Sequence, residues 1–225
     1  MKKIMALSLV IVTGLVALGA GCQSALNVNT NSSVNKNVMD GNTANQNAMA
    51  MNANQSMSMN QMQSDPNAAS APYDLQFLDT MSAHHKAAVE MAEVVLKKSS
   101  NEELKNFAQN IITDQNKEIG QMKDWREKWF AGKPAAKNME MAGMADSMKS
   151  MMDGGMKKLE AATGKDFDLM FLEMMTPHHQ GAVIMAKEAL TKAEHPEIKT
   201  LANQIIKEQE SEIKMMADWK AKWSK

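Results

Sequence analysis

Two short stretches of the chain each place a methionine three residues before a pair of adjacent histidines. They read "MSAHHKAAVEMA", from Met81, and "MTPHHQGAVIMA", from Met175. The chain has five histidines, and four of them form these two pairs, His84–His85 and His178–His179. Imidazole is a ligand of copper, zinc and iron, and thioether sulfur is a soft ligand that suits Cu(I). The residue types and their spacing therefore indicate metal binding.

Polar residues also interrupt the apolar seam of the segment that follows each histidine pair. They are Gln115, Glu118, Gln209 and Glu212. A carboxylate on a core-facing seam is costly unless it has a partner. We therefore expect these side chains to face the histidine-bearing segments.

Counting outward from the turn between two segments predicts which residues face one another. Around residue 100, this count places His84 opposite Gln115 and Met81 opposite Glu118. In the second half the corresponding pairs are His178 with Gln209 and Met175 with Glu212. Both histidine pairs lie near the middle of their segments, so we expect one central polar layer.

Each of these residues also has a structural interpretation. Glutamate–histidine pairs could serve helix packing alone, and the pairs in question are Glu118–His84 and Glu212–His178. Met91 and Met185 suit the filling of a core, because methionine adapts to irregular gaps. The fifth histidine, His195, is expected in an exposed loop. Duplication of the whole set favours metal binding over packing alone.

The pattern also discriminates between metals. A di-iron bundle needs Glu-x-x-His on two helices and a glutamate on each of the others. Here Met-x-x-His-His replaces the Glu-x-x-His motif, and each half of the repeat has only one glutamate on its apolar seam. The sequence has no Cys/His zinc spacing, no phosphate-binding loop and no base-activated serine. We expect copper or silver ions as the bound species.

An internal repeat must position these residues. Residue n matches residue n + 94 without a gap, so that "DLQFLDTMSAHHKAAVEMAEVVL" aligns with "DLMFLEMMTPHHQGAVIMAKEAL". Repeat one covers 74–130 and repeat two covers 166–225. Apolar residues in each half recur at alternating steps of three and four, which is typical of bundle helices. Each repeat is therefore predicted to be a helical hairpin, with Ser100 and Glu103 capping the second helix of the first one.

The two hairpins are joined by a long, methionine-rich connection over residues 131–165. Two hairpins with such a crossover predict an all-α, ferritin-like four-helix bundle over 73–225. We expect the connection to contain a short helix that lies on the bundle.

The N-terminus indicates export. Residues 1–21 have a basic start and a short apolar run that ends in small residues, which is typical of a signal peptide. The lone cysteine, Cys22, follows in "LGAGC", which resembles a bacterial lipobox and predicts lipid attachment at that residue. Residues 22–72 are rich in Asn, Ser and Met with few branched apolar residues, and predict a disordered tether. The predicted location is the cell envelope, outside the cytoplasm and anchored by lipid.

The charge balance argues against nucleic acid as a partner. Lys and Arg number 25, and Asp and Glu number 26. A nucleic-acid surface would show an excess of basic residues on one face. The expected partners are metal ions and, through the lipid, a membrane.

The paired segments "F-L-x-x-M-x-x-H-H-x-x-A-V-x-M-A" and "I-I-x-x-Q-x-x-E-I-x-x-M-x-x-W" resemble the domain of unknown function 305 (DUF305) family over residues 74–225. The resemblance implies an exported bacterial protein with a ferritin-like bundle, in a family with members implicated in copper or silver binding and tolerance. It places twelve residues on the family's motif positions: Met81, His84, His85, Met91, Glu118, Met122, Met175, His178, His179, Met185, Glu212 and Met216.

Three functions fit the sequence. The leading one is a membrane-tethered, extracytoplasmic protein that binds copper or silver for buffering or tolerance, without catalysis. A ferritin-like metal oxidase is the alternative enzyme. The third is an envelope adaptor without metal, in which the polar layer only fixes the register of the helices.

Overall fold

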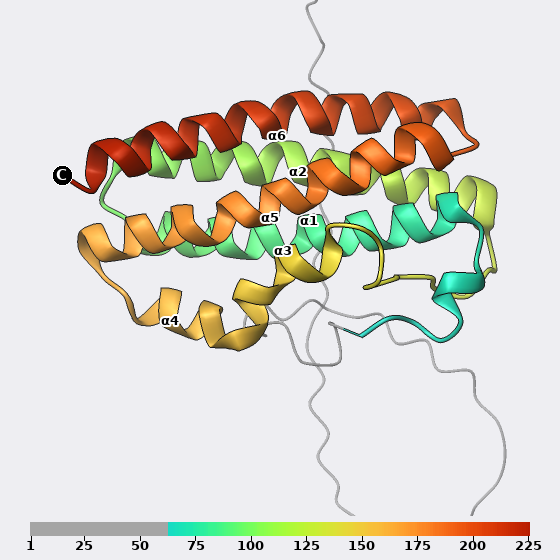
Figure 1. The fold of residues 1–225 in the computed structure, drawn as a ribbon, viewed down its shortest axis with the longest axis horizontal. Helices are drawn as coiled ribbons and strands as arrows, with labels where there is room; N and C mark the ends of the chain where they lie inside the picture. The colour runs from blue at the N-terminus through green and yellow to red at the C-terminus, as the bar shows by residue number, and fades with distance from the viewer. Residues whose placement is uncertain (1–62) are drawn as a thin grey trace, which may run out of the picture. The chain divides into compact units, whose positions relative to one another are not determined.

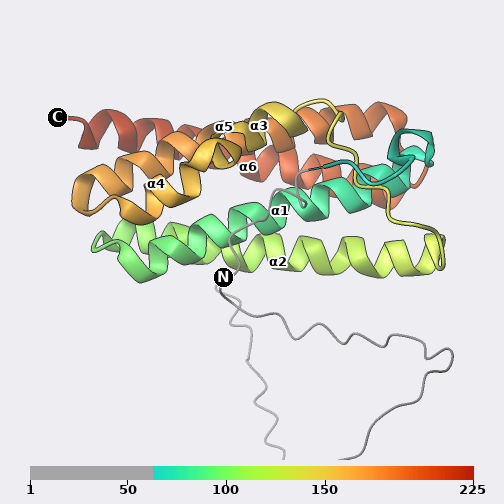
Figure 2. The same ribbon diagram turned by 90° about the horizontal axis from the view of Figure 1, so that it is seen from below.

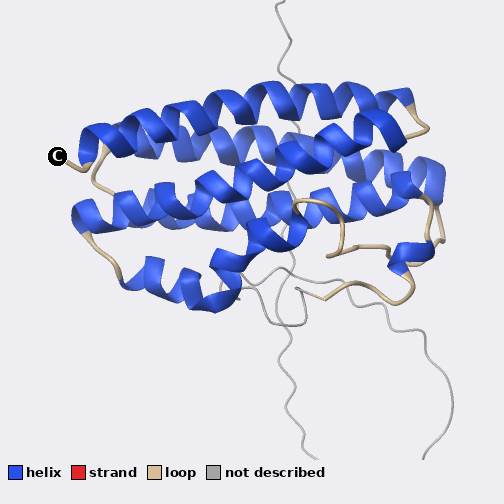
Figure 3. Ribbon diagram, in the orientation of Figure 1, coloured by secondary structure: helices blue, strands red, loops and turns tan. Residues whose placement is uncertain are grey.

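The computed structural model describes residues 63–225. The predicted signal peptide, the lipidation residue Cys22 and the tether up to residue 62 lie outside the described residues. Within the described part the regular structure is helical throughout, as Figure 3 shows. This confirms the predicted all-α class.

Four long helices form two antiparallel hairpins (Figure 1). The first hairpin consists of α1 (Tyr73–Lys98) and α2 (Glu102–Phe130), and the second of α5 (Gly164–Lys192) and α6 (Pro196–Trp223). Helices α1 and α5 pack against each other and join the two hairpins. The result is the four-helix bundle that the internal repeat predicts.

Helices α1 and α5 occupy the centre because they carry apolar and small residues on several faces. In α1, for example, Ala87, Ala88 and Ala92 are all buried. A helix with such a wide apolar surface is stable only when it is covered on more than one side. Helix α1 accordingly contacts α2, α5 and the crossover.

The crossover folds into short helices that lie on the bundle, as predicted (Figure 2). Helix α3 (Met144–Ser150) packs mainly on α5 and also touches α1. A single π-helical turn, η3 (Met151–Gly155), leads into α4 (Met156–Ala161). Methionines 144, 148 and 151 are buried, so thioether side chains fill the space between the crossover and the bundle.

The first helix turn of α2 is capped differently from the prediction. Asn101, and not Ser100, is the N-cap, and its Oδ1 accepts hydrogen bonds from the backbone N–H groups of Glu103 and Leu104. Asn is among the best N-cap residues, so it displaces the expected Ser100–Glu103 box.

Residues 63–72, which the sequence analysis assigns to the tether, have defined positions. They include a short 3-10 helix, η2 (Ala68–Ser70), in which Ala68 is buried. The N–H of Asp65 donates to the carbonyl of Lys137 at 2.8 Å, and the carboxylate of Asp65 accepts from the N–H of Lys137 at 2.7 Å. This segment therefore pairs with the start of the crossover.

No helix in the stretch 63–225 is both long enough and apolar enough to cross a bilayer.

Candidate metal centre

Two histidines from the two repeats meet at the crossing of α1 and α5. The ring centroids of His84 and His178 lie 3.7 Å apart, and their planes are inclined by 34°. Both side chains are buried, with 0% and 1% exposure. The central polar layer that the sequence predicts is therefore present, and its middle is this imidazole pair.

The adjacent histidines of each pair point to different neighbours, because successive residues of an α-helix are about 100° apart around the axis. His84 and His178 face each other across the two hairpins. His85 and His179 face the second helix of their own hairpin. The Nε2 atom of His85 lies 2.7 Å from Glu118 Oε2.

The second hairpin repeats this contact, with His179 Nε2 at 2.7 Å from Glu212 Oε2. The histidine that contacts each glutamate is therefore the second of its pair, and not the first. The assignment of Glu118 to His84 and of Glu212 to His178 is wrong. The turn between Lys98 and Glu102 is centred on residue 100, as the count assumed, so the difference lies in the pairing across the two helices and not in the place of the turn.

The contacts with glutamate determine which ring nitrogen of His85 and of His179 carries the proton and which carries the lone pair. An ionised carboxylate only accepts hydrogen bonds, so His85 and His179 donate to it through Nε2–H. In the neutral ring Nδ1 then carries the lone pair. Both Nδ1 atoms are buried and have no hydrogen-bond partner among residues 63–225. A carboxylate that orients an imidazole from behind is a frequent companion of metal-binding histidines.

The central pair is only partly satisfied by hydrogen bonds. His84 Nε2 lies 3.0 Å from the hydroxyl of Ser147 on α3. Within the described part of the chain, neither ring nitrogen of His178 has a hydrogen-bond partner. Leaving a buried polar atom unpaired costs roughly 1–3 kcal/mol, so the packing of the bundle does not explain His178.

Burial keeps the central histidines neutral. Desolvation, followed by the neighbouring imidazoles, holds the pKa of His84 well below the ordinary 6.5. The pKa of His178 is lowered for the same reasons. A neutral imidazole with an unshared lone pair is the form that binds a metal ion.

The predicted methionines belong to the buried core of the bundle. All six are fully buried: Met81, Met91, Met122, Met175, Met185 and Met216. Met81 and Met175 lie one helical turn from the central histidines, a spacing that puts side chains on one face. The sulfur of Met122 accepts a hydroxyl hydrogen bond from Ser82 at 3.8 Å. The sulfur of Met216 lies 3.8 Å from the hydroxyl of Thr176, which donates to the carbonyl of Leu172.

Nitrogen and oxygen ligands do not complete a site by themselves. Among residues 63–225, no group of three or more His, Cys, Asp or Glu side chains is arranged to hold a metal ion. The methionines of the same buried core offer thioether sulfur, a donor that suits soft ions.

Two residues, one at the centre and one away from it, differ from the expectations. Ser147, which hydrogen-bonds to His84, had no signal in the sequence because it lies in the crossover and outside the repeat. His195, which was expected in an exposed loop, is only partly exposed. Its Nδ1 lies 2.5 Å from Asp74 Oδ2, and its ring stacks on Trp129 at 3.8 Å between centroids. It lies away from the centre and serves the packing of the helix ends.

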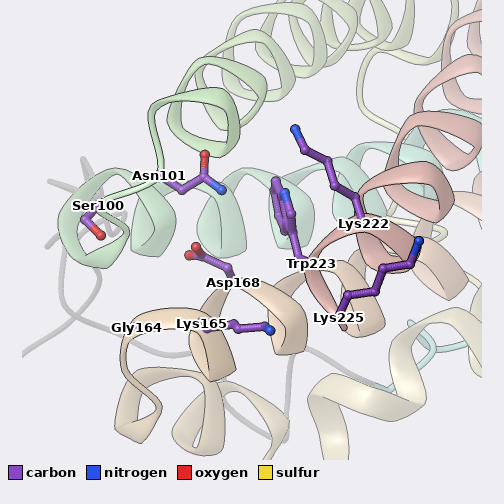
Figure 4. Close-up of a pocket in the computed structure, with 8 residues that line it drawn as sticks. All are labelled: Ser100, Asn101, Gly164, Lys165, Asp168, Lys222, Trp223 and Lys225. Carbon is purple, nitrogen blue, oxygen red and sulfur yellow. The ribbon is translucent and has the colours of Figure 1, made fainter.

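Two surface pockets of the stretch 63–225 have no histidine or methionine in their lining. Figure 4 shows a pocket of about 390 Å³ in which Trp223 lies between Asn101, Asp168 and three lysines. A smaller pocket of about 170 Å³ lies between α2 and α6. Neither is lined by a histidine or a methionine, so the imidazole and thioether groups belong to the interior.

Comparison with known proteins gives one family. The model of the domain of unknown function DUF305 matches residues 74–220. The crystal structure of a DUF305 protein from Streptomyces coelicolor is 34% identical, with a TM-score of 0.61, over 71% of this chain and 95% of that one.

Structures of CopM are similar as well. Its Cu(I)-bound form is 37% identical, with a TM-score of 0.56, over 67% of this chain and 96% of that one. Its silver-bound form, obtained by soaking, is 37% identical with a TM-score of 0.55, over the same shares of the two chains. No curated protein matches the chain.

Proposed function

The chain belongs to the DUF305 family, and we propose that it binds copper and silver ions at the centre formed by His84 and His178. The observation that carries the proposal is the buried contact of these two neutral rings, with both nitrogens of His178 unpaired within residues 63–225. Buried nitrogens without a hydrogen-bond partner reduce the stability of the folded protein. A bound ion would give the nitrogens a partner.

The donors around the pair support soft ions. Imidazole and thioether together favour Cu(I) and Ag(I). Cu(II) prefers imidazole and carboxylate ligands, which lie together in the outer pairs, His85 with Glu118 and His179 with Glu212. CopM, which is 40% identical to this chain, has a structure in a Cu(II)-bound form in addition to its Cu(I)- and silver-bound forms.

The proposal includes the location of the protein. Cys22 carries a lipid, the tether that follows it holds the bundle at a membrane surface outside the cytoplasm, and the bundle buffers copper or silver there. The support for this part is the signal sequence and the lone cysteine. Mass spectrometry of the membrane fraction tests it, and a diacylated mature N-terminus at Cys22 is the expected result.

Titration calorimetry of the purified chain with Ag(I), and with Cu(I) without oxygen, tests the metal site. The double variant His84→Leu/His178→Leu should lose the tight site, because leucine fills the space without a lone pair. His195→Asn is the matched control, because it removes a histidine that lies away from the centre. Asparagine is also the residue at the equivalent position of the first repeat, Asn101. Equal affinity of the double variant and the control would overturn the proposal.

A further inference from the structure

We infer that α3 is a gate that covers the metal centre and opens to admit an ion. We call the contact of Ser147 with His84 its latch, and the close contact of α3 with Gly181 on α5 its seat. This inference rests on the proposed function and adds how an ion would reach the site. The gate is the segment Gly143–Gly155, which contains α3 and the π-helical turn η3.

The need for a gate follows from burial. All four histidines of the two pairs are at most 1% exposed. The four long helices that surround them are 26 to 29 residues long and are held along their length. Helix α3 has seven residues and touches the centre directly. Short elements with few partners open at lower free energy than long core helices, so α3 is the cover most easily lifted.

The latch is a single hydroxyl. Ser147 Oγ donates to the carbonyl of Met144 at 2.8 Å, which uses its one proton. It must therefore accept from Nε2–H of His84, at 3.0 Å. Lifting α3 frees this nitrogen and uncovers the side of His84 that faces the crossover.

The seat depends on the absence of a side chain. A Cβ at Gly181 would lie 2.3 Å from Ser147 Cβ and 2.4 Å from the carbonyl oxygen of Gly143. In the first repeat the equivalent position is Ala87. The crossover can therefore approach α5 closely, whereas α1 lacks the glycine that such an approach requires.

The ends of the gate have hinge-like backbone. Gly143 precedes α3 with φ of +85°, and Gly154 follows it with φ of +75°. These are left-handed conformations that glycine adopts without strain. Gly154 lies within η3, which is one turn of π-helix, a feature that often accompanies functional sites.

The test compares Gly181→Ala, which should unseat α3, with Ser147→Ala, which removes only the latch. Gly120→Ala is the matched control, because it makes the same change in a helix with no atom within 4 Å of the new Cβ. Hydrogen exchange of residues 143–155 in the full chain reports whether α3 has lifted. The rate of histidine acylation by diethyl pyrocarbonate, without metal, reports access to the centre.

In Gly181→Ala we expect faster exchange in residues 143–155 and about tenfold faster acylation of His84 and His178, as for an opened lid. Ser147→Ala should fall between this variant and the control. Stopped-flow mixing with Ag(I) should show uptake and release accelerated together, with a smaller change in the dissociation constant.

Two results would overturn the gate. One is unchanged exchange of α3 in Gly181→Ala, which would refute the seat. The other is a lifted α3 with acylation and Ag(I) rates equal to those of the Gly120→Ala control. If no variant binds Ag(I), the proposed function fails, but the acylation and exchange rates still decide whether α3 covers the histidines.

Discussion

His84 of the first repeat and His178 of the second repeat are equivalent residues, and their rings lie 3.7 Å apart inside the bundle. The two hairpins therefore contact each other at this point through equivalent residues. One histidine per repeat, placed at the crossing of α1 and α5, becomes a pair of imidazoles. Duplication alone thus places two imidazoles in contact, an arrangement that a single hairpin could not form.

The replacement of His178 by leucine should stabilise the metal-free protein. It removes two buried nitrogens that have no hydrogen-bond partner within residues 63–225, and it keeps apolar volume. We expect the free energy of unfolding to rise by about 1–2 kcal/mol, measured by urea denaturation with a chelator present. A clear loss of stability in His178→Leu would mean that the ring has a structural role.

The two glutamates should differ in their contribution to stability although their contacts have the same length. Glu118→Ala leaves His85 buried without its partner, so we expect a loss of about 1–3 kcal/mol. The side chain of Glu212 is 19% exposed against 3% for Glu118, so water can replace it, and Glu212→Ala should cost less. Urea denaturation of both variants checks this order, and a larger loss in Glu212→Ala would contradict it.

Acidification should destabilise the bundle through the central histidines. Their pKa values are lowered in the folded state, so below pH 6.5 the unfolded chain binds more protons than the folded one. Stability is therefore complete above pH 6.5 and falls as the pH decreases, by up to about 1.4 kcal/mol per pH unit for each histidine.

Denaturation of the metal-free protein between pH 7.5 and 5.5 measures this slope. Glu208 acts in the opposite direction, because burial and the nearby carboxylates raise its pKa above the ordinary 4.5. The double variant His84→Leu/His178→Leu retains Glu208 and is the proper reference. An equal slope in this variant and the parent would show that the two histidines do not cause the acid sensitivity.

Asp74 should matter more than its repeat equivalent, Asp168. Asp74 is 3% exposed and accepts from the backbone N–H groups of Glu194 and His195 and from the His195 ring. Asp168 is partly exposed and accepts from the Ser99 hydroxyl. We expect Asp74→Ala to lose roughly 2–4 kcal/mol and Asp168→Ala about 1 kcal/mol, by urea denaturation. Losses of equal size would refute the assignment of Asp74 as the tie between α1 and the turn before α6.

The architecture could be predicted from the sequence because each half of the repeat independently supports the same helix assignment. Two copies of one apolar pattern, each with a break near its middle, allow little besides two hairpins. The central layer could be predicted for the same reason. The partner of each histidine could not be predicted, because adjacent residues on a helix face different neighbours and a count outward from the turn gives the facing residues only approximately.

The contacts made by the crossover and by the helix ends could not be predicted from the repeat. Ser147 lies outside the repeat, so no second copy marks it, and its contact with His84 depends on the close approach allowed by Gly181. His195 replaces Asn101 of the first repeat and pairs with Asp74, which is 121 residues away. Such long-range contacts leave no local pattern in a single sequence.

The most direct test of the metal centre is nitrogen NMR of the imidazole side chains during titration of the ¹⁵N-labelled chain with Ag(I). Nitrogens bound to a metal ion shift strongly, and the five histidines report separately. We expect the resonances of His84 and His178 to shift together and reach their end point with the first tightly bound ion, while those of His195 stay in place. Tight binding of Ag(I) with the His84 and His178 resonances unchanged would contradict the proposed centre.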